Sequence, residues 1–153
     1  MDHKQSMQLR GKKKEKGQSF FEVVLALALV AIVLMALVSL ATVSVRTATF
    51  SRNKNLATRL SQEAIEWLRS QRDAGWTNFV TKATTANWCL VNLDWSQPGS
   101  CNSTNVVTDT GIVRQVTLSI PDATTVQADV KASWVDGQGS HQITTSTFFT
   151  SWK

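Results

Sequence analysis

One apolar stretch decides the fold of this chain: residues 23–45 read VVLALALVAIVLMALVSLATVSV, without a charge. A helix needs about 20 predominantly apolar residues to cross a bilayer, so this stretch is long enough. Neither glycine nor proline occurs between Gln18 and Asp73, and nothing in the sequence interrupts a helix there. We therefore predict one helix from about Ser19 to Arg72, on the order of 80 Å long.

The residues just before the apolar stretch form a second distinctive pattern. Residues 12–16 read KKKEK, Gly17 follows them, and Glu22 stands five residues after that glycine. An ionised side chain in hydrocarbon costs about 2.5–3.5 kcal/mol at the centre of a helix and less near the interface. Glu22 is therefore a functional candidate, and its expected partner is a positive charge.

This pattern resembles the class III signal of type IV pilins and pseudopilins. In that family a prepilin peptidase cuts after the glycine, the new N-terminal residue is methylated, and the glutamate docks subunits in a filament. The resemblance places the cut between Gly17 and Gln18, methylation on Gln18 and docking on Glu22. It implies a structural subunit of a type IV pilus or type II secretion pseudopilus, which would support adhesion, motility, secretion or DNA uptake.

Two residues depart from the family pattern. Gln18 stands where the family usually has Phe or Met, but the amine that is methylated is unaffected. Ser39 stands where many major pilins carry a helix-breaking proline, which favours a minor pilin or pseudopilin.

The resemblance also implies partners and a location. The partners are prepilin peptidase, other pilin subunits, the membrane, and an inner-membrane assembly platform with its ATPase. Lysines beside a hydrophobic span hold that end in the cytoplasm, so the C-terminal domain is expected outside. The chain is thus expected to cross the cytoplasmic membrane once and, after assembly, to lie at the cell surface. We expect no enzyme activity, no cofactor and no metal.

Other interpretations remain open at this point. The apolar stretch is also compatible with a removable secretory signal, although a typical apolar region of such a signal has only about 7–15 residues. A separate alternative for Glu22 is a stray glutamate near the lipid headgroups, where water can reach it. Two further alternatives concern the whole chain. It is either a signal-anchored domain that never polymerises or a minor tip pilin that acts as a binding module.

The chain divides into four predicted parts. Residues 1–17 are a basic leader that is removed, 18–45 the transmembrane and filament-core half of the helix, 46–74 its amphipathic half, and 75–153 an extracytoplasmic β domain with a disulfide loop. The leader holds six lysines or arginines and two acidic residues, which leaves only +1 of the chain's +5 for the remainder. This charge distribution argues against a nucleic-acid-binding surface on the domain.

The second half of the helix has one apolar face, and the residues after it alternate as strands do. The apolar face repeats with the helical period, and strands are predicted at 112–120, 126–135 and 141–150, with a short one near 88–93 and a hairpin turn at 136–139. The prediction is an α+β pilin fold, a long helix packed on an antiparallel sheet. The residues on these buried faces are Leu56, Leu60, Ala64, Trp67 and Leu68 of the helix, and Val116, Leu118, Ile120, Val126, Ala128, Val130, Ala132, Trp134, Ile143, Thr145, Thr147 and Phe149 of the strands.

Cys89 and Cys101 bracket a polar loop and are expected to form a disulfide outside the cytoplasm. Unpaired buried thiols are the alternative. A zinc site is disfavoured because neither His3 nor His141 has a ligand-like spacing to the cysteines.

The six tryptophans and a group of basic residues are the remaining candidates for binding. Trp67 and Trp134 fall on buried faces, whereas the other tryptophans are near loops or ends, where they either pack or form a binding surface. The basic stretch after the membrane segment is expected to be a solvated helix face or to contact lipid headgroups. Binding of nucleic acid is a weaker alternative for it. The loop tryptophans are Trp76, Trp88, Trp95 and Trp152, and the basic residues are Arg46, Arg52, Lys54 and Arg59.

Overall fold

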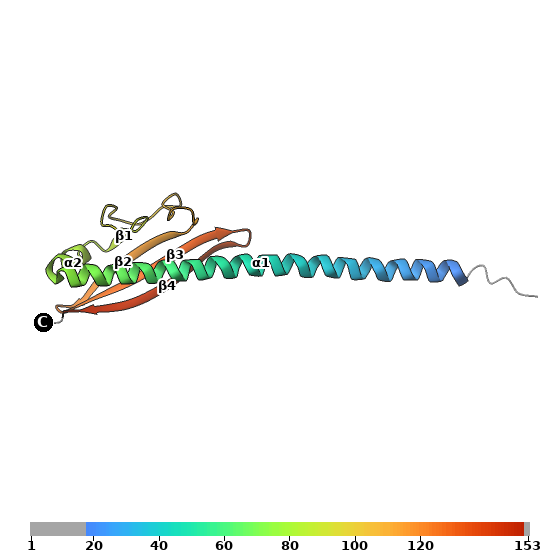
Figure 1. Cartoon of the computed structure of the whole chain (residues 1–153), viewed down its shortest axis with the longest axis horizontal. Helices are drawn as coiled ribbons and strands as arrows, with labels where there is room; N and C mark the ends of the chain where they lie inside the picture. Colours follow the sequence, from blue (N-terminus) through green and yellow to red (C-terminus); the bar gives the residue numbers. More distant parts are fainter. Residues whose placement is uncertain (1–17, 152–153) are drawn as a thin grey trace, which may run out of the picture. The chain divides into compact units, whose positions relative to one another are not determined.

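The computed structural model describes residues 18–151 and contains two helices and four strands (Figure 1). The chain divides into two compact units, the first ending at Arg46 and the second starting at Thr47. The long helix α1 belongs to both units, and all other elements belong to the second. In chain order the elements are α1 (Gln18–Ala74), α2 (Trp76–Ala83), β1 (Asn87–Cys89), β2 (Val113–Asp122), β3 (Thr125–Asp136) and β4 (Gly139–Thr150).

The first unit consists of the apolar part of α1. Its side chains are exposed from Phe20 to Val45, and the most apolar window of the helix has no buried residue. Within residues 18–151, α1 is the one helix that is long and apolar enough to cross a membrane. The predicted uninterrupted helix is confirmed, with its end two residues later than expected.

The second unit contains one antiparallel sheet with strand order β1-β2-β3-β4. The longest pairing joins β3 and β4, from Thr125 opposite Thr150 to Asp136 opposite Gly139, without a shift in register. Gly137 and Gln138 form the two-residue hairpin loop between these strands, as predicted.

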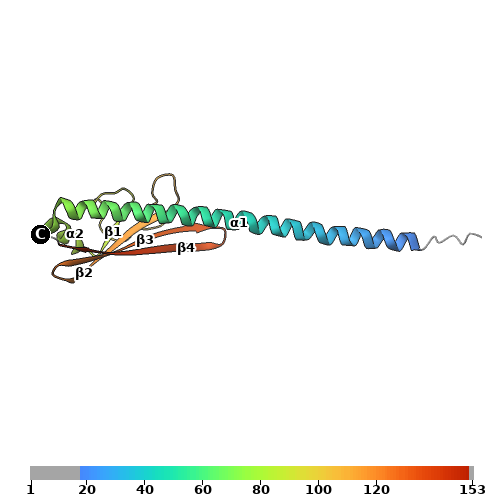
Figure 2. The ribbon, with the colours of Figure 1, turned by 60° about the horizontal axis from the view of Figure 1, so that its bottom comes forward.

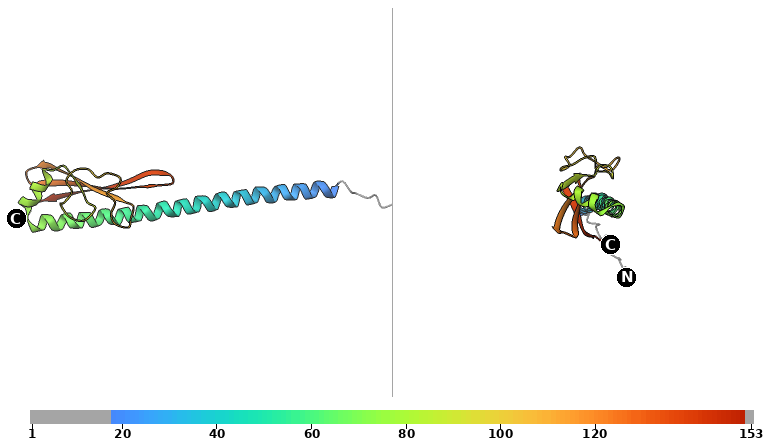
Figure 3. Two further views of the ribbon diagram at one scale, coloured as in Figure 1. Left: turned by 90° about the horizontal axis from the view of Figure 1, so that it is seen from above. Right: turned by 90° about the vertical axis from the view of Figure 1, so that its left-hand side faces the viewer.

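The part of α1 after Thr47 packs on one face of this sheet (Figures 2 and 3). The alternation predicted for residues 126–135 is confirmed, because all its even-numbered residues are buried by this packing. The helix contributes Ala57, Leu60, Ala64 and Leu68, and the strands contribute Val116, Leu118, Val126, Ala128, Val130, Ala132, Trp134 and Phe149.

Three details of the predicted β region were wrong. The helix α2 was not predicted, and the strand predicted near residues 88–93 is limited to Asn87–Cys89. Ile120 was placed on the buried face of its strand, but its side chain is 41% exposed. The register of β2 against β3 shifts between Ser119 and Asp122, and this irregularity ends the alternation after Leu118.

Two adjacent phenylalanines on β4 test this register. Phe149 is 1% exposed and packs in the core, whereas Phe148 is 62% exposed on the opposite face. We predict that Phe149→Ala lowers the free energy of unfolding by about 3–5 kcal/mol. Phe148→Ala should change it by no more than about 0.5 kcal/mol. Denaturant unfolding of the detergent-solubilised chain, followed by tryptophan fluorescence, measures both; a larger loss from Phe148→Ala would mean that β4 is shifted by one residue.

Candidate functional site

Glu22 lies in the second turn of α1, in the first unit. It is the one charged residue between Gln18 and Val45, and its side chain is exposed among exposed apolar neighbours such as Phe21 and Val23. Among the side chains that the structure describes, from Phe20 to Ser151, no hydrogen bond or ion pair to Glu22 occurs. Gln18 is the first residue of α1, whereas Gly17 and the lysines before it lie outside the described residues. The Glu22 carboxylate is thus exposed and has no partner among these described side chains.

In the second unit, Cys89 and Cys101 form the predicted disulfide. The backbone of the enclosed loop folds back onto β1, because the Cys89 amide donates to the carbonyl of Gln97 at 2.9 Å and the Gly99 amide donates to that of Asn87 at 2.8 Å. The chain-entropy model assigns a cross-link over a loop of this size about 3 kcal/mol. The disulfide and these backbone bonds together fix the position of Trp95 within the loop.

Trp95 connects the disulfide loop to the end of α1. Its ring centroid lies 4.6 Å from that of Trp67 and 5.0 Å from that of Trp88. Its indole Nε1 donates a hydrogen bond to Oε1 of Gln71 at 3.0 Å. Trp88 is only 6% exposed and donates from its own indole to the carbonyl of Lys82. Trp88 is therefore a core residue, and the idea that it forms part of a loop binding surface is wrong.

Trp134 and Trp76 also pack within the unit. Trp134 is buried, as predicted, and Trp76 is half-buried with its ring 6.1 Å from that of Phe79. Trp152 lies outside the described residues. Trp95 is half-buried, like Trp76, and each of these two tryptophans lines a pocket.

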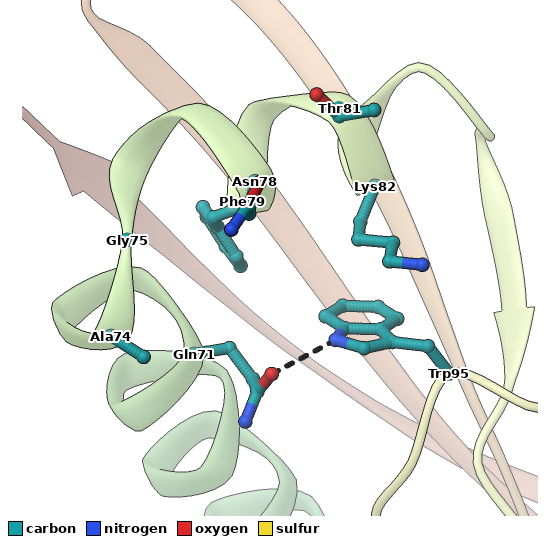
Figure 4. A pocket seen from close by; sticks show the side chains of 8 residues that line it. All are labelled: Gln71, Ala74, Gly75, Asn78, Phe79, Thr81, Lys82 and Trp95. Atoms are coloured by element: carbon teal, nitrogen blue, oxygen red, sulfur yellow. Dashed lines mark hydrogen bonds between the residues drawn. The ribbon is translucent and has the colours of Figure 1, made fainter.

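A pocket of about 440 Å³ lies beside Trp95, between the end of α1 and α2 (Figure 4). In Figure 4 the side chains of Asn78, Phe79 and Lys82 extend from α2 towards Gln71 and Trp95. The ammonium of Lys82 lies 5.5 Å from the ring centroid of Trp88, a cation–π contact that orients it. The lining residues are Gln71, Ala74, Gly75, Asn78, Phe79, Thr81, Lys82 and Trp95.

Arg114 is a buried charge that the sequence analysis missed. It lies on β2 with 2% of its surface exposed, and its Nε donates to the carbonyl of Leu90 at 3.0 Å. Its Nη1 donates to the carbonyl of Leu60 on α1 and to the carboxylate of Glu63, each at 3.1 Å. Burial lowers the pKa of the Arg114 guanidinium, and the charge of Glu63 opposes that shift. Arg114 thus joins α1, β2 and the segment after β1.

His141 and the basic residues of α1 are the other polar candidates. His141 is partly buried, its Nε2 lies 3.0 Å from Oδ1 of Asp136, and its ring is 5.1 Å from that of Phe50. Within residues 18–151, no group of three or more His, Cys, Asp or Glu side chains is placed to hold a metal ion. The basic residues Arg52, Lys54 and Arg59 are exposed along α1 in the second unit.

Comparison with known proteins identifies no relative: no protein-family model, curated protein or solved structure matches the chain. The fold and the sites described above are therefore the basis for any functional conclusion.

Arg114 provides a test of how the second unit is held together. Arg114→Met keeps an unbranched side chain but removes the donors to two buried carbonyl groups, so we predict a loss of about 2–4 kcal/mol in the free energy of unfolding. Glu63→Gln is the matched control, because Glu63 is half exposed and its surface pairing should contribute less than about 1 kcal/mol. Equal losses from both substitutions in denaturant unfolding would show that the ion pair, not the carbonyl contacts, stabilises the unit.

Proposed function

We propose that this chain is the precursor of a filament subunit of the type IV pilin or pseudopilin class, with a structural and not a catalytic role. The single observation that carries the proposal is the lone Glu22 in the second turn of an otherwise uncharged helix segment, five residues after Gly17. The long helix on an antiparallel sheet is compatible with the same class.

The exposed apolar surface of α1 supports assembly in two stages. Before assembly, the surface from Val23 to Val45 would lie in the lipid bilayer, where a helix satisfies its own backbone hydrogen bonds. After assembly, the same surface would pack against α1 of neighbouring subunits. An exposed apolar surface of this extent requires either lipid or protein to cover it.

Glu22 would set the register of this packing. Cleavage after Gly17 would create a positively charged amine at Gln18, and an incoming subunit would dock where its amine meets the Glu22 carboxylate of a neighbour. Desolvation offsets much of the attraction in such a pair, but breaking one partner leaves a buried charge that costs about 3–5 kcal/mol. The main effect of the pair would therefore be to select one register between neighbouring subunits, and its contribution to the stability of the filament would be smaller.

The proposed partners follow from this role. Prepilin peptidase would remove residues 1–17, and an inner-membrane assembly platform with its ATPase would extract subunits from the membrane. The basic leader would remain cytoplasmic and the second unit would lie outside. Whether the filament serves adhesion, motility, secretion or DNA uptake is a separate question from its assembly.

Mass spectrometry of the exported protein tests the cleavage. We expect an N-terminus at Gln18 carrying one methyl group, and we expect Gly17→Val to leave the leader attached because a β-branched residue replaces the unhindered glycine. An intact leader on exported, functional protein would contradict the proposal. So would a terminus after Ala28 or Ala41, which end the small-residue sites ALA (26–28) and SLA (39–41) at which a secretory signal would be cut.

Substitution of Glu22 tests its docking role. Glu22→Ala should leave cleavage at Gln18 intact and reduce incorporation into filaments at least about tenfold, since the amine of each incoming subunit would lose its partner. Glu22→Asp keeps the charge and serves as the control, with incorporation at least partly retained. Quantification of subunits in sheared filaments measures both variants; normal incorporation of Glu22→Ala would rule out docking by this carboxylate.

A further inference from the structure

The pocket beside Trp95 has a chemical character that the filament role does not explain. Lys82 is the one charged residue in its lining, and no acidic residue lines it. Within residues 18–151, no carboxylate lies within ion-pair distance of the Lys82 ammonium. Asp94, the residue next to Trp95, is engaged by the amide and hydroxyl of Ser96, which lower its pKa. Lys82 therefore brings to the wall of the pocket an ammonium that contacts the ring of Trp88 and has no carboxylate partner within residues 18–151.

The amide of Gln71 adds a donor with a fixed orientation. Indole Nε1 can only donate, so the bond from Trp95 identifies Oε1 as the Gln71 atom nearest the ring. Its Nε2 is then the Gln71 atom left free to donate to a ligand, and Asn78 contributes a second amide without a hydrogen-bond partner in the described part of the chain. Two amides and one ammonium give a lining that is rich in donors.

The aromatic and apolar groups complete the site. The indole of Trp95 and the buried ring of Phe79 line the pocket together with the polar groups above (Figure 4). Its volume of about 440 Å³ lies within the range of roughly 300–1,000 Å³ that is typical of small-molecule sites. An aromatic surface beside a few placed polar groups suits a ligand with an apolar ring face and polar edges.

We propose that this pocket binds a sugar ring that carries one carboxylate, such as a hexuronate unit of an acidic glycan. The carboxylate would pair with Lys82, the hydroxyl groups would accept from Gln71 and Asn78, and the C–H face of the ring would pack on Trp95. A single ammonium matches a single negative charge, whereas phosphate favours several cations or the fork of an arginine. Single-stranded nucleic acid requires a positively charged groove along its backbone, which one lysine does not form.

Calorimetric titration of the detergent-solubilised full chain tests the proposal directly. The probes are tri-galacturonate, its neutral methyl ester, and an oligothymidylate of similar length. Tri-galacturonate should bind, and the methyl ester should bind at least about tenfold more weakly, because it lacks the charge that pairs with Lys82. Equal affinity for acid and ester, or no binding of tri-galacturonate at millimolar concentration, would overturn the proposal, as would oligothymidylate binding that displaces it.

Two variants locate the binding in this pocket. Lys82→Met and Gln71→Glu should each weaken tri-galacturonate binding at least about tenfold, and Gln71→Glu retains an acceptor for the Trp95 indole so that the loop stays in place. Lys131→Met, on β3, is the control and should leave affinity unchanged. Near-ultraviolet circular dichroism checks that all three fold. Unchanged affinity in Lys82→Met would overturn the assignment, and this outcome is independent of cleavage at Gly17 or of filament assembly.

Discussion

The continuity of α1 is the constraint on which the rest of the structure depends. A single helix from Gln18 to Ala74 satisfies its own backbone hydrogen bonds throughout, so its side chains alone determine which surroundings each part can enter. From Val23 to Val45 the helix is apolar on all sides, and after Thr47 it narrows to one apolar stripe. The antiparallel sheet buries that stripe, whereas nothing within the described residues covers the earlier apolar surface.

The segment between α2 and β2 is held by individual contacts and has little regular structure. The disulfide closes its first loop, Trp95 connects that loop to α1, and Arg114 connects the backbone after β1 to α1. Each of these contacts joins residues far apart in sequence. The same contacts place Gln71, Lys82 and Trp95 around one pocket, so the features that stabilise this irregular segment also create its candidate ligand site.

The parts of the fold that follow from local sequence pattern were predictable. The absence of glycine and proline predicted α1, strict alternation predicted β3, and Gly137 in the turn sequence predicted the hairpin. The helix α2 also has apolar residues at a helical period, namely Trp76, Phe79, Val80 and Ala83. It was not predicted because polar residues separate them.

Features that depend on tertiary contacts were not predictable in this way. Arg114 has the same parity as Val116 and Leu118, so the alternation already placed it on the buried face, but its charge argued against burial. The pocket draws on α1, α2 and the disulfide loop, and only the folded chain brings these segments together. Glu22 was found because its offset from Gly17 is a local feature, and its partner stays a prediction because it would belong to another molecule.

The most direct test of the account is a zero-length carbodiimide cross-link in purified filaments assembled from mixed ¹⁵N-labelled and unlabelled subunits. The account predicts cross-linked peptides that join the amine of Gln18 to the carboxylate of Glu22 and that combine one labelled with one unlabelled partner. Filaments in which this cross-link is absent, or always has both partners from the same subunit, would contradict the claim that Glu22 pairs with the neighbouring chain.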